Sequence, residues 1–168
     1  MAELAPRERL QPSLLDRLTD DEPDQQVEAR DRRVLSVRGL REGVLRDLAW
    51  LLNTTNLLSV TDVPRLPHVA GSVLNYGMPD MSGASLANMN AADLERAIRQ
   101  AIWDFEPRLI RSSVSVKALP HQESISKIMF EIQADLWAQP YPERLFLKTE
   151  LDLDLAQISL TEFSGARP

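Results

Sequence analysis

The hydrophobic pattern of the chain changes its period once, and this change limits the folds open to it. Up to Phe105 the apolar residues recur at helical spacing, and from Leu109 onward they alternate with polar residues as in strands. Helices followed by a run of strands are typical of an α+β domain in which the helices pack on one face of a sheet. We therefore predict N-terminal helices packed on a small antiparallel three-stranded sheet.

Three segments before this change have helical spacing. The first spans residues 40–53, the second begins near residues 62–64 and stops at Gly77, which can adopt positive φ, and the third begins at an Asn90 cap. Pro107 excludes Glu106 from the helical conformation and ends the third. Trp50 and Trp103 fall on the sides opposite the apolar stripes, where they could contact a partner or be covered by a second layer or the N-terminal tail.

Three segments after the change alternate as strands, at residues 109–117, 128–136 and 145–155. The last one has leucines on one side and charged residues on the other. As the terminal strand of a three-strand meander it would have one unpaired edge. Such an edge can be blunted by charge, as Asp152 and Asp154 would do, or serve as a template for another strand, and Leu151 and Leu153 are its candidate partner-binding residues.

The 168 residues predict one folded domain with a tail at each end. Residues 1–31 are predicted to be a tail with a short docking helix, formed around Leu14, Leu15 and Leu18, and an acidic linker. Residues 32–160 form the α+β domain, and residues 161–168 a C-terminal tail. The alternative for the N-terminal segment is a frayed end without a role.

Composition excludes several kinds of protein. A net charge of −6 argues against binding to the phosphate backbone of nucleic acid. The chain has no cysteine, and its two histidines, His68 and His121, have no further ligand at metal spacing, so neither a metal nor another cofactor is expected. No apolar run approaches the ~18 residues of a membrane helix, so no membrane insertion is expected and a cytoplasmic protein is the simplest interpretation.

Five motifs follow one another along nearly the whole chain: PSLLDRL (12–18), DLAWLLNTTN (47–56), SVLNYGMPDM (72–81), FEPRL (105–109) and LKTELDLD (147–154). In this order they resemble the TssE family of type VI secretion baseplate proteins. That family is related to the lysozyme-like wedge proteins of contractile phage tails. The combination of NYG, Pro79, Asp80 and the later FEPRL is the most specific part of the resemblance.

The resemblance implies a structural subunit rather than an enzyme. Its implied partners are the baseplate subunits TssF, TssG and possibly TssK, and the sheath proteins TssB and TssC. It also implies a sheet like the interlocking domain of the sheath, a role in starting sheath polymerisation, and a place in a cytoplasmic baseplate docked at the inner-membrane complex.

Two groups of residues are candidate partner contacts with a local alternative. Glu106, Pro107 and Arg108 form a stiff corner whose guanidinium could pair with a partner carboxylate or with a neighbouring side chain. The resemblance favours the partner contact. Tyr76 and Asp80 either belong to a binding loop or only follow a helix stop and turn, which Gly77 and Pro79 already explain.

Two other functions remain as alternatives. A peptidoglycan-cleaving glycosidase would need two carboxylates across a sugar cleft, one with a raised pKa. Asp104 and Glu106 are close in sequence, but Arg108 should lower the pKa of Glu106, the wrong direction for a general acid. A freestanding assembly adaptor would account for the tail and the acidic charge equally well.

Overall fold

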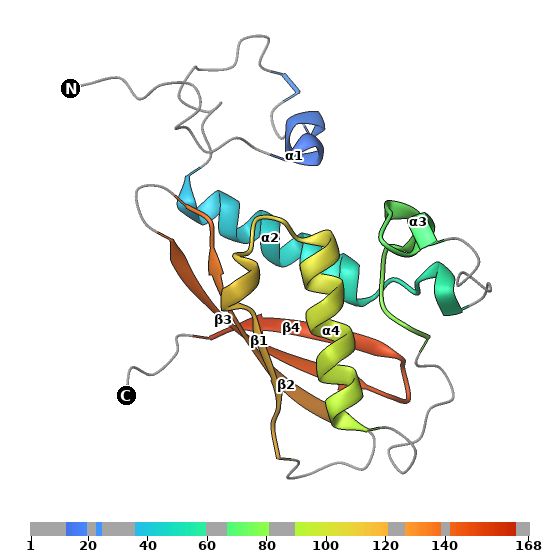
Figure 1. The fold of residues 1–168 in the computed structure, drawn as a ribbon. Coiled ribbons are helices and arrows are strands. Elements are labelled where there is room, and N and C mark those ends of the chain that lie inside the picture. Colours follow the sequence, from blue (N-terminus) through green and yellow to red (C-terminus); the bar gives the residue numbers. More distant parts are fainter. Residues whose placement is uncertain are drawn as a thin grey trace.

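The structure is a computed structural model and describes residues 13–19, 23–24, 36–59, 67–80, 90–120, 127–138 and 142–163. The predicted start of the second helix, His121, most of the acidic linker and the C-terminal tail beyond residue 163 lie outside these residues. The elements appear in Figure 1. In chain order they are α1 (Leu14–Leu18), α2 (Val37–Leu52), η3 (Leu57–Ser59), α3 (Pro67–Ala70), η5 (Val73–Asn75), α4 (Ala91–Phe105), η6 (Arg111–Ser113), β1 (Ser115–Ala118), β2 (Lys127–Leu136), β3 (Glu143–Asp152) and β4 (Gln157–Glu162).

The predicted α+β class is confirmed, but the sheet has four strands and not three. Its order is β1-β2-β3-β4, and every neighbouring pair is antiparallel. Leu151 of β3 lies opposite Ile128 of β2 on one side and opposite Ile158 of β4 on the other. Because β3 is paired on both sides, the predicted free edge on the strand that carries Leu151 is wrong.

The predicted third strand ends earlier than its alternation suggests, because a turn occupies residues 153–156. The carboxylate of Asp152 accepts hydrogen bonds from the backbone N–H groups of Asp154 (3.0 Å) and Leu155 (3.1 Å), and Ala156 adopts a φ of 49°. Leu153 therefore lies in the turn, and Leu151 is buried in the core. Leu153 and Leu155 continue the apolar–polar alternation of β3 into this turn, so the hydrophobic period does not reveal where the strand ends.

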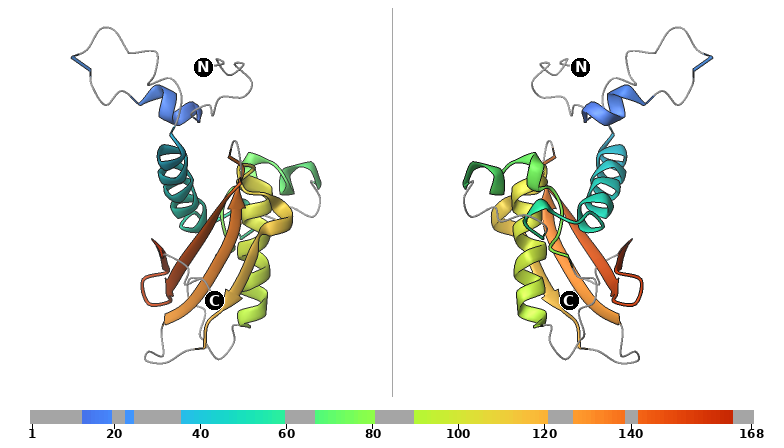
Figure 2. Two further views of the ribbon diagram at one scale, coloured as in Figure 1. Left: turned by 90° about the vertical axis from the view of Figure 1, so that its left-hand side faces the viewer. Right: turned by 90° about the vertical axis from the view of Figure 1, so that its right-hand side faces the viewer.

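The core lies between one face of the sheet and helices α2 and α4, as Figures 1 and 2 show. α4 packs against β1, α2 packs against β4, and the two helices contact each other. The predicted helices at residues 40–53 and from Asn90 are confirmed, and the Asn90 side chain caps α4. The buried residues recur at helical spacing: Leu40, Gly43, Val44, Leu48, Leu51 and Leu52 of α2, and Leu94, Ile98, Ala101 and Ile102 of α4.

Two predicted elements are more broken than expected. The described part of the second helical segment consists of α3 and η5, separated by Gly71 and Ser72, and the Ser72 hydroxyl caps the new turn at the N–H of Leu74. The first predicted strand is interrupted by η6, so that β1 begins only at Ser115. A side-chain cap accompanies the break before η5, whereas the N-cap of η6, Ile110, has no side-chain cap.

Candidate partner interface

The corner Glu106–Arg108 is formed where α4 ends and the chain turns toward the sheet. Glu106 is the C-cap of α4, with its backbone N–H donating to Ile102 O (2.9 Å). After Pro107, the carbonyl of Arg108 accepts a hydrogen bond from the N–H of Trp137 (2.8 Å), just beyond β2. The corner is therefore held by both α4 and the end of β2.

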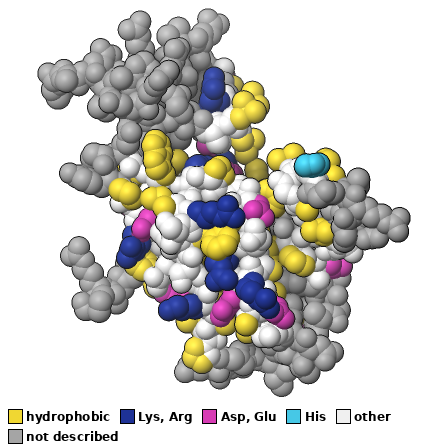
Figure 3. All heavy atoms as spheres, viewed as in Figure 1, with side chains coloured by type: hydrophobic (Ala, Val, Ile, Leu, Met, Phe, Trp, Pro, Cys, Tyr) yellow, Lys and Arg dark blue, Asp and Glu magenta, His cyan; other side chains and the backbone are white. Residues whose placement is uncertain are grey.

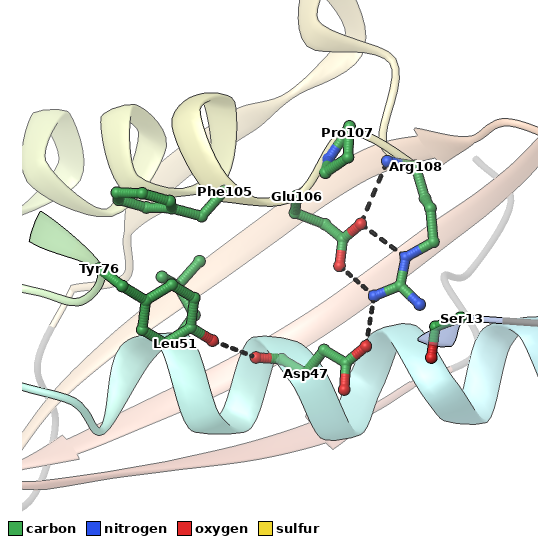
Figure 4. A pocket seen from close by; sticks show the side chains of 8 residues that line it. All are labelled: Ser13, Asp47, Leu51, Tyr76, Phe105, Glu106, Pro107 and Arg108. Carbon is green, nitrogen blue, oxygen red and sulfur yellow. Dashed lines mark hydrogen bonds and ion pairs between the residues drawn. The ribbon is translucent and has the colours of Figure 1, made fainter. Parts of the chain in front are cut away.

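The guanidinium of Arg108 joins two carboxylates of its own chain (Figure 4). Its Nε donates to Glu106 Oε1 (2.7 Å), and its Nη2 contacts both Glu106 Oε2 and Asp47 Oδ2, the latter at 2.6 Å. The backbone N–H of Arg108 also donates to Glu106 Oε1 (3.1 Å). Two acids of α2 and α4 thus share one fork-shaped cation.

Of the two alternatives for the guanidinium, the structure shows pairing with neighbouring side chains of the same chain. Glu106 is only 4% exposed, and the local ion pair is the arrangement that the structure has. Burial alone would lower the pKa of Arg108, but its hydrogen bonds and attraction to Glu106 and Asp47 outweigh burial and raise it. Pro107 is the exposed residue of the corner, and its contact with a partner stays a prediction.

A cavity of ≈ 350 Å³ opens beside this ion pair. Its apolar wall includes Tyr76 and Phe105, whose rings meet edge to face at 5.3 Å. The hydroxyl of Tyr76 donates to Asp47 O (3.4 Å). Burial and the nearby carboxylates of Asp47 and Glu106 raise the pKa of Tyr76, against the opposing charge of Arg108. The structure thus joins the predicted loop residue Tyr76 to the corner through α2.

Asp80, the other loop candidate, is exposed and does not line this cavity. Its backbone N–H donates to the hydroxyl of Ser59 (2.8 Å). The two loop residues are therefore in different surroundings. A partner contact by either of them stays a prediction.

Helix α1 rests on α2 through charge and not through apolar burial. Asp16 Oδ1 accepts from Arg46 Nη1 (2.6 Å), and Arg46 Nη2 lies 2.8 Å from Asp47, so the ion pairs continue from α1 to Arg108. α1 has no buried residue, and its leucines are 70%, 39% and 75% exposed at Leu14, Leu15 and Leu18. The structure thus has a short helix at the predicted leucines, and its docking on a partner stays a prediction.

The charge on Asp16 holds this contact over a wide pH range. Burial raises its pKa, but hydrogen bonds from Ser13 and Arg46 and the charge of Arg46 outweigh burial and lower it. A lowered pKa means that the pair contributes above the ordinary carboxylate range and is lost only when the pH falls through the folded-state value. The ion pair that holds α1 on α2 is therefore intact at neutral pH.

Replacing Asp16 with Asn should release α1 from α2. The amide oxygen can still accept from Ser13 N–H, as the carboxylate does, but the ion pair with Arg46 is lost. A five-residue helix is unstable alone, so the amide hydrogens of Arg17 and Thr19 should exchange about tenfold faster.

An Asp93→Asn variant is the control, because Asp93 pairs with Arg96 inside the well-packed α4. Both variants should keep the free energy of unfolding within about 0.5 kcal/mol. Unchanged exchange of Arg17 and Thr19 in the Asp16→Asn protein would show that other contacts hold α1.

The two tryptophans singled out in the sequence, Trp50 and Trp103, lie in different environments. Trp50 is 53% exposed, with Arg46 over its ring at 5.5 Å. The expectation that Trp103 stays off the core is wrong, because it packs against the core, donates its indole N–H to Arg111 O (2.9 Å) and is flanked by Arg99 and Arg111. Basic side chains gather on this α4 side, as Figure 3 shows. A further partner contact at Trp50 or Trp103 stays a prediction.

The sequence reasoning missed several exposed apolar residues. Trp137 is 53% exposed and directly follows β2, with its backbone bonded to Arg108. The sequence did carry a signal for this exposure. The buried residues of β2 alternate and include Leu136, so the next residue, Trp137, falls on the opposite, outer side. Leu58, Val73 and Leu74 are also exposed, on η3 and η5, which contact each other.

The two acids of the corner, Asp47 and Glu106, are both paired with Arg108. Asp104, the other acid considered for catalysis, is exposed and hydrogen-bonded to Gln100 at 2.9 Å. Among the residues that the structure describes, no acid, histidine or cysteine group could hold a metal ion, and no helix could span a membrane. The described residues thus form an α+β domain with an ion-paired corner between α2 and the end of α4.

The comparison with protein families identifies the kind of assembly. A family model described as baseplate wedge protein gp25 matches residues 38–141, and the chain belongs to this family. The match includes α2 from its second residue, the cavity residues other than Ser13, α4 and the corner, and it confirms the resemblance to baseplate wedge proteins. No curated protein and no solved structure matches the chain. The family is one of structural baseplate proteins, which supports a structural role.

Proposed function

We propose that the chain is the TssE-like wedge subunit of a type VI secretion baseplate. In this role it binds TssF and TssG, with TssK as a further candidate partner, through α1 and the corner, and its sheet binds the sheath proteins TssB and TssC. The baseplate would then stand in the cytoplasm, docked at the inner-membrane complex, and the subunit would help to start sheath polymerisation.

The open edge of β4 is the observation that carries this proposal. β4 is paired on one side with β3, and within the described residues no strand covers its other side. An exposed strand edge of a soluble domain is a template for another strand unless it is blunted. Backbone pairing would supply affinity for an extended segment of the sheath, and alternate side chains would supply specificity.

Replacing Glu162 with Pro tests this role at the edge. Glu162 lies opposite Leu147 as a pair without mutual hydrogen bonds, since Phe163 N–H donates to Phe146 O, so the Glu162 N–H points away from β3. Proline there removes a donor for an incoming strand and keeps the bonds between β3 and β4. We expect baseplates with this variant to bind TssF and TssG normally, but sheath growth in purified TssB and TssC should fall at least about tenfold.

Glu162→Ala is the matched control, because it removes the same carboxylate and the same ion pair with Arg41 but keeps the N–H. It should support normal sheath growth. Equal growth from both variants would show that the edge is not the template. Failure of the wild-type chain to enter a complex with TssF and TssG would instead favour the freestanding adaptor.

A further inference from the structure

The free edge of β4 is already occupied at one residue by a side chain. Asn53, the C-cap of α2, accepts from Ile158 N–H with its Oδ1 and donates from its Nδ2 to Ile158 O, both at 2.8 Å. These are the two hydrogen bonds that a residue of a neighbouring strand would make. The second hydrogen of the Asn53 amide donates to Ala49 O (2.8 Å), which fixes the side chain to its own helix.

The alternation of an antiparallel ladder shows which other groups of β4 face outward. Hydrogen-bonded and non-hydrogen-bonded pairs alternate along two strands. Since Ile158 is bonded to Asn53 and Phe163 to Phe146, the outward-facing residues are Ile158, Leu160 and Glu162. Within the described part of the chain, the backbone N–H groups of Leu160 and Glu162 make no hydrogen bond outside β3 and β4.

A second side chain of α2, Arg41, lies at the other end of β4. Its Nη2 donates to Arg144 O (3.3 Å), on the side of β3 that faces β4 and two residues before Phe146. Its Nε lies 3.1 Å from Glu162 Oε1. Asn53 and Arg41 therefore bracket a short open stretch that contains Leu160 and Glu162.

The opposite edge of the sheet is partly blocked as well. The outward N–H of Ala118 in β1 donates to the carboxylate of Glu95 in α4 (2.7 Å). On β4, by contrast, the half-buried Leu160 packs against the core beside the open backbone groups. A guest strand on β4 would extend the sheet and could cover Leu160 with an apolar side chain.

We infer that β4 accepts one extended partner segment at Leu160 and Glu162, and that Asn53 fixes its register by filling the place opposite Ile158. This inference rests on the proposed pairing with a sheath protein. If the partner strand were shifted by two residues, its side chains would stay on the same faces of the sheet, but the strand would move by about 7 Å along β4. Asn53 excludes that displacement, so it sets where the next subunit lies relative to the wedge.

Amide exchange in the free full-length protein tests the cap itself. The Ile158 amide should exchange about tenfold more slowly than those of Leu160 and Glu162, although all three lie in β4. Asn53→Ala should remove this difference. Asn53→Asp should retain it, because the carboxylate still accepts from Ile158 N–H. Equal exchange of the three amides in the wild-type protein would overturn the assignment of Asn53.

The same measurement with purified TssB and TssC tests the register. In the wild-type protein the amides of Leu160 and Glu162 should slow at least about tenfold, and in Asn53→Ala the Ile158 amide should slow with them on binding. If only the amides of Leu160 and Glu162 slow on binding, in the wild type and in Asn53→Ala alike, then the strand pairing is right and the register role of Asn53 is wrong. If no β4 amide slows, the proposed strand pairing fails and the inference fails with it.

Discussion

Replacing Arg108 with Ala should lower the free energy of unfolding by about 3 kcal/mol, because it leaves a buried carboxylate without its cation. Glu106 is buried, and the Arg108 guanidinium donates to both of its carboxylate oxygens. The same guanidinium donates to Asp47 Oδ2. Arg108 itself is about a quarter exposed, so the expected loss is at the low end of the range for broken buried pairs. In thermal unfolding this corresponds to a decrease of about 6–12 °C.

Two further variants separate charge from geometry. Arg108→Lys keeps a cation but cannot bond both oxygens of Glu106 as a fork, so its loss should be intermediate. In a double variant, Arg108→Met with Glu106→Gln, the buried charge is removed together with its partner, and much of the stability should return. An Arg108→Ala protein as stable as the wild type would mean that water or another group compensates Glu106.

Elements with a matching cap and hydrophobic period could be predicted from the sequence. α4 has an Asn90 cap, a continuous apolar stripe and a stop at Pro107, and all three agree with the structure. β4 could not be predicted in this way, because the turn before it contains no glycine or proline and its leucines continue the alternation of β3. Its turn depends on the side chain of Asp152 and on Ala156 at positive φ.

The site was predicted only where its residues are neighbours in sequence. The motif drew attention to Glu106 and Arg108, but Asp47 lies 61 residues before Arg108, and Asp16 lies 30 residues before Arg46. Both acids are brought to the corner by the packing of α2 and α1, which a period cannot reveal. The same holds for Asn53 and Ile158, separated by 105 residues.

Gly77→Ala should have the largest effect of any small substitution in the described residues, with an expected loss of at least about 3 kcal/mol. Gly77 has a φ of +120°, and an added Cβ would lie 2.2 Å from the backbone oxygen of Thr54. That oxygen accepts from Met78 N–H (2.7 Å), and Met78 O in turn accepts from Asn56 N–H (2.8 Å). The methyl group would therefore strain the backbone and also push the segment of Gly77 and Met78 away from the segment of residues 54–56.

Gly71→Ala is a matched control, because no heavy atom beyond its own residue and its chain neighbours lies within 4 Å of its added Cβ. Its thermal unfolding should change by no more than about 2 °C, against at least about 6 °C for Gly77→Ala. The Gly77 variant should also loosen both interfaces, since Tyr76 at the cavity and Asn53 at the β4 edge adjoin the bridge between residues 55 and 78. Faster exchange of the Ile158 amide in Gly77→Ala would reveal this coupling. A stable protein with unchanged Ile158 exchange would show that the loop accommodates the methyl group and that the two interfaces are independent of it.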